Sequence, residues 1–409
     1  MRRLLTGNGA AAWGMRLAGA EYIPAFPITP QTEIIETIGG WIEDGEFDAR
    51  MVTMDSEHSM ITAAGTAAAT GVRVFSATSS QGLLYAMEML YSVAGWRAPF
   101  VLVNVSRALS SPVTLEPDHN DVLAARDSGF LQIHCATCQE VVDCMVLAYR
   151  LGEDRRVRLP VIVNLDGYYL SFTREPVELP PQELVHRFLP PFEQKSAPIR
   201  AGDPVSQGVA VLGGSQYSYF RYETHHGARN ALPVFKEITD EYEELTGCSY
   251  PTLEEYRTED ADIVFFMIGS FATKAKAAID RMREKGLKPG LVRPRLLRPF
   301  PDEDIARALQ GKKGVAVVDQ NISFGKGGIL HGELASTLYN RDKRPAVLVS
   351  FIGGLGGRDI SEEEFEEMFT VTARAAESGK VPRPRLLYTR EELAQMHGLQ
   401  AIAAAKEKR

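Results

Sequence analysis

The chain has 409 residues, of which 44% are hydrophobic and 24% are charged, and these values are ordinary for a globular protein. The net charge of −8, without a sustained basic stripe, excludes the electrostatic footprint of a nucleic-acid-binding protein. The longest apolar runs, such as residues 263–268, are far too short to span a membrane, and residues 1–9 lack the apolar core of a signal peptide. We therefore expect a cytoplasmic protein of two or three domains that binds neither nucleic acid nor membrane.

A proline-bracketed corner, Phe26-Pro27-Ile28-Thr29-Pro30, separates the first predicted strand from the helix that follows it. Pro27 favours an extended conformation for the residue before it. Thr29 stands where a helix N-cap belongs, and Pro30 stands at the first helical position, where its missing N–H costs nothing. Such corners at the carboxyl edge of a parallel sheet are where α/β proteins bind ligands. The simpler alternative is a well-capped turn without a ligand.

Strands and helices alternate through the first half of the chain, and polar residues follow each predicted strand. The predicted strands cover residues 21–26, 51–54, 72–76, 100–105 and 160–165, and the predicted helices cover residues 9–20, 63–69, 83–91 and 141–151. Continuous apolar strands indicate burial on both faces. We therefore expect a parallel sheet with helices on both faces and a ligand at the carboxyl ends of the strands.

The second half begins after a proline-rich stretch at about 172–206, which has no periodicity and predicts a crossing linker. Residues 231–246 have a helical pattern, and a second α/β pattern starts at about residue 262. The predicted domains are residues 1–240, including the linker, and residues 255–375. A polar tail over 376–409 is expected to carry a surface or partner-docking helix from about residue 394.

Three of the four cysteines, Cys135, Cys138 and Cys144, lie close together after His134. A metal site or a redox CxxC pair is one interpretation. A tetrahedral metal needs four ligands, however, and His134 would point away from Cys135 on a strand. We favour buried thiols that fill the space between a strand end and the next helix, and a four-cysteine ligand set for an iron–sulfur cluster is absent.

Two charged residues stand at predicted strand ends where they could act on a ligand. Glu57 precedes a helix of small residues, where it either balances the positive helix terminus or acts on a cofactor nitrogen in a dry crevice. Arg107 follows an apolar strand, where it either binds a carboxylate or phosphate or forms an interface salt bridge. The glycine loop 325–328 could approach a phosphate and leaves a nucleotide-binding dehydrogenase as an alternative, although it lacks the GxGxxG pattern after the first strand.

Eight segments in order give the chain a specific resemblance to the alpha subunits of 2-oxoacid:ferredoxin oxidoreductases of the pyruvate synthase type. They are Gly7-Asn8-Gly9-Ala10, Pro27-Ile28-Thr29-Pro30, Asp55-Ser56-Glu57-His58, Ser79-Ser80-Gln81-Gly82, Ser106-Arg107-Ala108-Leu109, Asp118-His119, Asn164-Leu165-Asp166-Gly167 and Arg298-Pro299-Phe300-Pro301. The resemblance is dense over residues 5–175 and looser over 260–355. It implies a parallel-sheet thiamine-diphosphate pyrimidine-binding domain, followed by a smaller α/β domain like the C-terminal domain of transketolase.

The resemblance also implies a cofactor, a reaction and roles for individual residues. Glu57 matches the glutamate that hydrogen-bonds N1′ of the aminopyrimidine ring of thiamine diphosphate. Thr29 and Arg107 match residues that hold the substrate, and Arg107 would pair with the carboxylate that leaves as carbon dioxide. The implied reaction converts a 2-oxoacid and coenzyme A into an acyl-CoA and passes the electrons to iron–sulfur clusters. The other residues assigned to the cofactor are Pro27, Ile28, Ser80 and Gln81.

The missing parts of this machinery imply partners. The sequence has no Gly-Asp-Gly motif with a following asparagine pair, which holds Mg²⁺ and the diphosphate in this class of enzyme. The resemblance therefore implies a beta-type subunit with the diphosphate and Mg²⁺ half-site, a gamma-type subunit and a ferredoxin-like iron–sulfur subunit. A non-catalytic scaffold subunit is an alternative, although the intact Glu57, Thr29 and Arg107 argue against it.

The substrate remains open at this point. Pyruvate-type relatives carry an Ile-Trp pair where this chain has Leu115-Glu116-Pro117. The loss of a bulky aromatic side chain would enlarge the pocket. A larger acid such as phenylglyoxylate is therefore an alternative to pyruvate.

Overall fold

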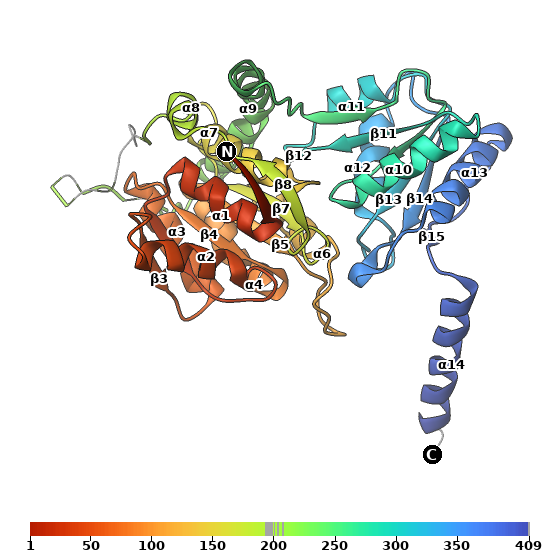
Figure 1. Cartoon of the computed structure of the whole chain (residues 1–409), viewed down its shortest axis with the longest axis horizontal. Helices are drawn as coiled ribbons and strands as arrows, with labels where there is room; N and C mark the ends of the chain where they lie inside the picture. The colour runs from red at the N-terminus through yellow and green to blue at the C-terminus, as the bar shows by residue number, and fades with distance from the viewer. Residues whose placement is uncertain (193–198, 200, 203, 207, 408–409) are drawn as a thin grey trace.

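The computed structural model describes residues 1–192, 199, 201–202, 204–206 and 208–407, with side chains described to residue 401. Two α/β domains lie side by side, and the C-terminal helix α14 (Arg390–Glu407) extends away from the second of them (Figure 1). This confirms the helix expected in the tail. None of the helices among the described residues is long and apolar enough to cross a membrane.

The sheet of the first domain is parallel at its centre. Its parallel neighbours are, in order, β4 (Phe75–Thr78), β5 (Val101–Ser106), β7 (Val161–Asp166) and β6 (Leu131–His134). The parallel pair β2 (Tyr22–Ala25) and β3 (Arg50–Thr53) adjoins β4 through a bridge between Tyr22 and Val74. The predicted parallel sheet is confirmed.

Helices cover both faces of this sheet, as the apolar strands predicted. Successive side chains of a strand point to opposite faces of the sheet. Accordingly, Val101 and Val103 of β5 belong to one apolar cluster and Leu102 belongs to another, so both faces are buried. Helices α1, α2 and α7 pack on the first side, and α3 and α5 pack on the second. The helices of this domain are α1 (Gly7–Ala18), α2 (Thr32–Glu43), α3 (Glu57–Ala69), α4 (Ser80–Tyr85), α5 (Met87–Trp96), α6 (Asn120–Ala124), the 3₁₀ turn η1 (Ala125–Asp127), α7 (Cys138–Glu153), α8 (Gln182–Phe188) and α9 (Gly214–Thr246).

The second domain has a six-stranded sheet of its own. The strands, in spatial order, are β15 (Arg385–Leu386), β14 (Val347–Ile352), β13 (Gly314–Asp319), β10 (Ile263–Phe266), β11 (Pro289–Pro294) and the antiparallel edge strand β9 (Leu253–Tyr256). The accompanying helices are α10 (Phe271–Glu284), α11 (Asp302–Ala308), α12 (Ile329–Leu338), the 3₁₀ turn η2 (Leu355–Gly357) and α13 (Glu362–Ser378). The second α/β pattern expected from about residue 262 is therefore present.

The corner after β2 differs from its prediction. Helix α2 begins at Thr32, and its N-cap is Gln31, so neither Thr29 nor Pro30 starts the helix. A turn intervenes, in which the backbone N–H of Gln31 donates to the carbonyl of Ile28 at 3.0 Å and the Gln31 side chain donates to the carbonyl of Phe26 at 2.9 Å. The N-cap assignment of Thr29 was wrong because these bonds close the corner before the helix starts.

The predicted linker at 172–206 also needs correction. Residues 174–178 form β8 (Arg174–Glu178), which pairs antiparallel with β1 (Arg2–Thr6), and α8 follows at residues 182–188. The prediction missed β8 because its partner strand lies about 170 residues earlier in the chain. Residues 193–198, 200, 203 and 207 of this stretch lie outside the described residues.

Several contacts hold the carboxyl edges of the two sheets against each other. Strand β12 (Leu296–Arg298) leaves the second domain and pairs antiparallel with β6 of the first. At the end of β7, Asp166 accepts hydrogen bonds from the backbone N–H and the hydroxyl of Ser270, which follows β10 (2.7 and 2.5 Å). One apolar cluster also runs from Phe100 and Ile162 into Val264 and Val317. The edge at which a ligand was expected is therefore a boundary between the two domains.

Candidate functional site

Three segments that are distant in sequence meet at the guanidinium group of Arg107, directly after β5. Its Nη1 donates to the backbone carbonyl of Thr29 at 2.7 Å, and its Nη2 donates to Oε1 of Gln81 at 2.7 Å. Its Nε is buried and has no partner among the described residues. The structure therefore brings together three predicted site residues, Thr29, Gln81 and Arg107, and leaves the Nε–H of the arginine without a partner among the described residues.

Ser80 links this cluster to the start of α4. Its hydroxyl donates to Oε1 of Gln81 at 2.6 Å or to the carbonyl of Ala108 at 3.0 Å. Ser80 has φ 51°, in the left-handed region that few non-glycine residues occupy. Such strained positions persist only where the surrounding bonds fix them, and they concentrate at functional sites.

Glu57 lies at the first position of α3, and its side chain is buried. The helix is capped by Ser56, whose hydroxyl accepts from the N–H of Ser59 at 3.2 Å. The residue is only 6% exposed, and its carboxylate makes no hydrogen bond or ion pair among the described residues. A buried polar group without a partner costs free energy, so an unpaired carboxylate here is the signature of a ligand position.

Gly82 makes room for this carboxylate and connects it to the Arg107 cluster. A Cβ atom at Gly82 would collide with Oε1 of Glu57 and would lie 2.7 Å from the hydroxyl of Thr78. The Thr78 hydroxyl is also buried without a partner. The Glu57 carboxylate thus lies against Gly82, the residue that follows Gln81 in α4. Of the other predicted residues, Pro27 is exposed and Ile28 is half-buried at the corner, and no printed contact joins either of them to Glu57.

A buried polar network beneath this site was missed by the sequence analysis. Asn104 of β5 faces Asn164 of β7 in register, and its amide donates to Oδ1 of Asn164 at 2.8 Å. The hydroxyl of Ser106 donates either to the same oxygen at 2.8 Å or to Oδ1 of Asp121 at 3.1 Å. The available signal was an asparagine inside each of two apolar strands, VLVNVS and VIVNLD. Polar residues inside buried strands must find partners, and here they find each other.

A fully buried ion pair continues this network to the second domain. Nε2 of His119 lies 2.7 Å from Oδ1 of Asp166. Burial opposes the charge on His119, but the Asp166 carboxylate outweighs it and raises the pKa of His119. Asp166 has a lowered pKa, because the bonds from His119 and Ser270 outweigh its burial. Nearby His134 has no such partner, and burial lowers its pKa to about 3, so its ring is neutral.

The glycine loop 325–328 does not offer a phosphate site. It precedes α12, whose first N–H groups already have an acceptor within the chain. Asp319 at the end of β13 accepts from the N–H of Leu330 at 2.8 Å and of His331 at 3.2 Å. A Cβ atom at Gly328 would overlap this carboxylate, so only glycine at position 328 leaves room for the Asp319 side chain. Because a carboxylate occupies the position that a phosphate would take, the dehydrogenase alternative loses its support.

The cysteine cluster is buried, as the favoured interpretation expected. Cys135, Cys138 and Cys144 are free thiols inside the first domain. Burial raises the pKa of Cys138 to about 12 and also raises that of Cys135. Protonated, inaccessible thiols are poor nucleophiles and poor metal ligands.

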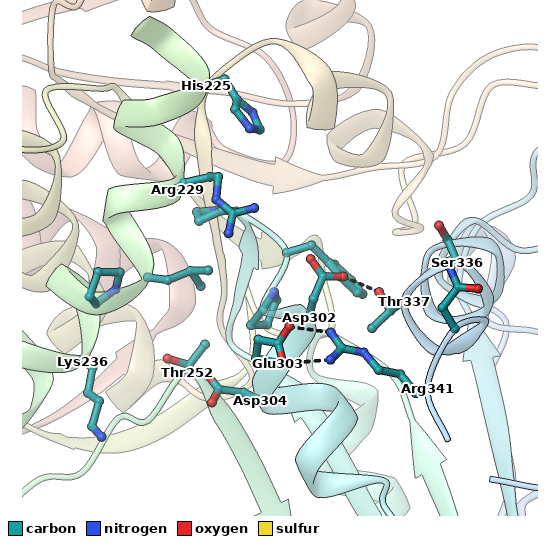
Figure 2. Close-up of a pocket in the computed structure, with 16 residues that line it drawn as sticks. His225, Arg229, Lys236, Thr252, Asp302, Glu303, Asp304, Ser336, Thr337 and Arg341 are labelled. Carbon is teal, nitrogen blue, oxygen red and sulfur yellow. Dashed lines mark hydrogen bonds and ion pairs between the residues drawn. The ribbon is translucent and has the colours of Figure 1, made fainter. Parts of the chain in front are cut away.

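A hollow lies between the domains, and none of the residues around Glu57 and Arg107 lines it. It has a volume of about 780 Å³ and is lined by α9 on one side and by α11 and α12 on the other (Figure 2). Cationic Arg229 and Lys236 line it together with acidic Asp302, Glu303 and Asp304, and Arg341 is paired with Glu303 at 3.0 Å. The groove contains none of the predicted site residues, and its charges are of both signs.

Comparison with known proteins identifies this arrangement. A family model described as pyruvate flavodoxin/ferredoxin oxidoreductase, thiamine diphosphate-binding, matches residues 13–243, which is more than half of the chain. The chain belongs to the pyruvate flavodoxin/ferredoxin oxidoreductase family. A second model, for core domain II of pyruvate:ferredoxin oxidoreductase, matches residues 261–365. The resemblance drawn from the eight sequence segments is therefore confirmed.

Curated relatives within this oxidoreductase family match almost the whole chain. Pyruvate synthase subunit PorA of Pyrococcus furiosus is 40% identical over 384 residues, which cover 94% of this chain and 96% of the relative. PorA of Methanothermobacter thermautotrophicus is 41% identical over 366 residues, covering 90% and 94%. Ketoisovalerate oxidoreductase subunit VorA of Pyrococcus horikoshii is 38% identical over 384 residues, covering 94% and 96%.

A solved structure has the same fold. The 2-oxoglutarate:ferredoxin oxidoreductase of Magnetococcus marinus superposes with a TM-score of 0.69 at 21% identity, over 90% of this chain and 65% of that one. The expected thiamine-type α/β architecture is therefore confirmed.

The residues around Glu57 fit the pyrimidine side of thiamine diphosphate. An aminopyrimidine ring carries nitrogen atoms that donate and accept hydrogen bonds, and it is otherwise flat and apolar. The unpaired Glu57 carboxylate and the unpaired Thr78 hydroxyl supply polar partners inside a buried crevice. These two polar groups are therefore suited to the aminopyrimidine ring of the thiamine diphosphate that the family model names.

Proposed function

We propose that this chain is the alpha-type subunit of a heteromeric 2-oxoacid:acceptor oxidoreductase. In this proposal it contributes the pyrimidine side of the thiamine site and the group that binds the substrate carboxylate. The observation that carries the proposal is the buried, unpaired carboxylate of Glu57 beside the cluster of Arg107, Gln81 and Thr29. Family membership supports the same assignment, because the matched family model is thiamine-diphosphate-binding.

Glu57 would hold N1′ of the aminopyrimidine ring. When bound, thiamine diphosphate supplies the electron-accepting carbon centre that decarboxylation of a 2-oxoacid requires. Glu57 is suited to hold and exchange a proton at the ring nitrogen, since no described residue offers its carboxylate a competing partner. The residue is only 6% exposed, and a hydrogen bond to a charged group is stronger in such buried surroundings.

Arg107 would bind the substrate carboxylate. Its buried Nε is free, and its Nη2 bond to Gln81 is one that a substrate carboxylate could replace. A planar guanidinium group matches two carboxylate oxygens with two parallel bonds. The Nη1 bond to the carbonyl of Thr29 would keep the group in place.

Pyruvate is the first substrate we propose, because relatives named pyruvate synthase reach 40–41% identity. The ketoisovalerate oxidoreductase relative, at 38%, makes a branched aliphatic 2-oxoacid the second. The Leu115-Glu116-Pro117 loop has no aromatic side chain, and its apolar residue Leu115 is 43% exposed. A larger acid such as phenylglyoxylate stays an untested alternative.

The remaining parts of the reaction are assigned to partners. The relatives are named as subunits, so the family works as multi-subunit assemblies. We assign Mg²⁺ and the diphosphate to a beta-type subunit, and the iron–sulfur clusters to partners that include a ferredoxin-like subunit, with a gamma-type subunit completing the complex. Coenzyme A would be the acyl acceptor. The cytoplasmic location expected from the sequence stays a prediction.

The division of the cofactor site predicts that the isolated chain binds thiamine diphosphate weakly and independently of Mg²⁺. The strongest contacts of the cofactor come from its diphosphate and the metal that bridges it, whereas one or two hydrogen bonds on the pyrimidine side add about 1 kcal/mol each. Calorimetric titration of the isolated chain and of the co-purified complex measures the difference. The complex should also reduce a viologen dye when supplied with a 2-oxoacid and coenzyme A.

Two results would contradict this proposal. Micromolar, Mg²⁺-dependent binding by the isolated chain would show that the cofactor site is not divided between subunits. A complex that holds thiamine diphosphate and yet oxidises none of pyruvate, 2-oxoisovalerate, 2-oxoglutarate and phenylglyoxylate would show that the reaction is wrong.

Arg107→Lys should raise the KM for the 2-oxoacid by about tenfold to 100-fold, because lysine keeps the charge but loses the planar pair of donors. Steady-state kinetics of the assembled complex at varied 2-oxoacid concentration measures the change. Arg97→Lys is the matched control, since Arg97 is also half-buried and lies outside the proposed site. It donates to the carbonyls of Val157, Arg158 and Glu223 and pairs with the Glu223 carboxylate at 3.9 Å. An unchanged KM in Arg107→Lys would remove the substrate role from this residue.

A further inference from the structure

The carboxylate of Asp121 is a meeting point for two backbone segments of the site. Asp121 lies in the first turn of α6 and is completely buried. Its carboxylate accepts hydrogen bonds from the N–H of Ser80 (3.0 Å), the N–H of Arg107 (3.2 Å), the N–H of Val122 (2.7 Å) and the amide of Asn104 (3.2 Å), and the hydroxyl of Ser106 can donate to it at 3.1 Å in place of its bond to Asn164.

Two of these donors belong to the residues that present the substrate-binding side chains. The N–H of Ser80 precedes Gln81, and Ser80 has the strained φ of 51°. The N–H of Arg107 belongs to the arginine itself. One oxygen atom, Oδ2, accepts both bonds and so joins the start of α4 to the end of β5. Gln81 and Arg107 then meet at 2.7 Å on the other side of this junction.

We propose that Asp121 is a positioning residue, which holds the backbones of Ser80 and Arg107 so that Gln81 and Arg107 form one substrate-binding pair. The inference rests on the proposed function only for the identity of the ligand, a 2-oxoacid carboxylate. The remaining bonds of Asp121 to Asn104 and Ser106 anchor it to the paired strands β5 and β7. The substrate pair is thereby fixed to the centre of the sheet and not to a loop alone.

Asparagine at position 121 tests this role, because it keeps the size of the side chain. An amide offers one accepting oxygen and one N–H₂ group. Some of the buried N–H groups that now donate to the carboxylate would therefore face the N–H₂ group of asparagine. We expect Asp121→Asn to raise the KM for the 2-oxoacid by about tenfold, with a smaller effect on kcat. We also expect amide hydrogen exchange to be faster in peptides covering residues 79–84 and 106–109 of the assembled complex.

Asp143→Asn is the matched control for a general loss of stability. Asp143 is also a buried aspartate, 2% exposed, and it lies on α7, on the far side of the sheet from α3. It accepts bonds from the hydroxyls of Tyr242 (2.6 Å) and Tyr250 (2.5 Å). This variant should leave the KM and the exchange of the two peptides within about twofold of the parent.

The outcomes separate this inference from the proposed function. Unchanged exchange in both peptides, or faster exchange with an unchanged KM, would overturn the positioning role of Asp121. If the parent complex converts no 2-oxoacid, the proposed function fails, while the exchange comparison still shows whether Asp121 holds the two segments. Should Asp121→Asn not assemble, Asn104→Ser removes one donor to Oδ2, and unchanged exchange near Ser80 and Arg107 in that variant would equally overturn the role.

Discussion

Replacing Glu57 with glutamine is expected to lower the turnover of the assembled complex by at least about 100-fold, the usual scale for a positioned proton-transfer group. The amide has nearly the shape of the carboxylate, so the crevice formed with Gly82 and Thr78 should stay intact. It cannot take up a proton from the pyrimidine nitrogen as a carboxylate does. The KM for the 2-oxoacid should change far less than kcat, because the substrate carboxylate is assigned to Arg107.

Asp55→Asn provides the matched comparison for Glu57→Gln. Asp55 is a carboxylate only two residues earlier, but it is exposed and lies outside the crevice. Its removal should change turnover by less than about twofold. Gel filtration of each variant complex establishes that assembly is preserved, and turnover with saturating 2-oxoacid and coenzyme A gives the comparison. Near-normal turnover in Glu57→Gln would disprove the role given to Glu57.

Glu140→Gln is expected to destabilise the chain by about 3–5 kcal/mol, the usual cost of removing one partner from a buried ion pair. The Glu140 carboxylate on α7 accepts from Arg293 at 2.5 Å and from Arg295 at 3.0 Å, and Arg293 is completely buried. Glutamine would leave the Arg293 guanidinium with one charged partner, Glu254, in place of two. Because α7 and β11 belong to different domains, the loss should also weaken their packing.

The pH dependence of this cluster follows from the pKa of Glu140. Burial alone would raise it, but Arg293 and Arg295 outweigh burial and lower the pKa to about 2, from 4.5. The unfolded chain therefore takes up this proton at a higher pH than the folded chain does. The contribution of Glu140 to stability is complete above about pH 5 and is lost as the pH falls towards 2.

Urea unfolding of the full chain at pH 7 and at pH 4 tests both statements about Glu140. The difference between the parent and Glu140→Gln should shrink at the lower pH. Glu237→Gln is the control, because Glu237 pairs with exposed Arg156 at the surface and should cost less than about 1 kcal/mol. Equal effects of the two substitutions would show that the buried cluster does not stabilise the domain boundary.

The sequence by itself determined the family and the parallel α/β architecture, and it singled out the residues to which the proposed site is assigned. These features have local signatures: apolar runs for buried strands, small residues for close helix packing, and short motifs such as Asp55-Ser56-Glu57-His58. Glu57 and Arg107 could be singled out because each follows a predicted strand, where the carboxyl edge of a parallel sheet places its functional residues.

Only the tertiary structure decided how these pieces meet. The pairing of β8 with β1, the addition of β12 to the first sheet and the bonds from Ser80 and Arg107 to Asp121 all join separate segments of the chain. The start of α2 at Thr32 depends on side-chain and backbone bonds within the corner. The helix propensities of single residues do not predict such bonds. Local patterns record how a segment is buried, whereas the partner of a buried polar group is set by strand order and register, which no single segment encodes.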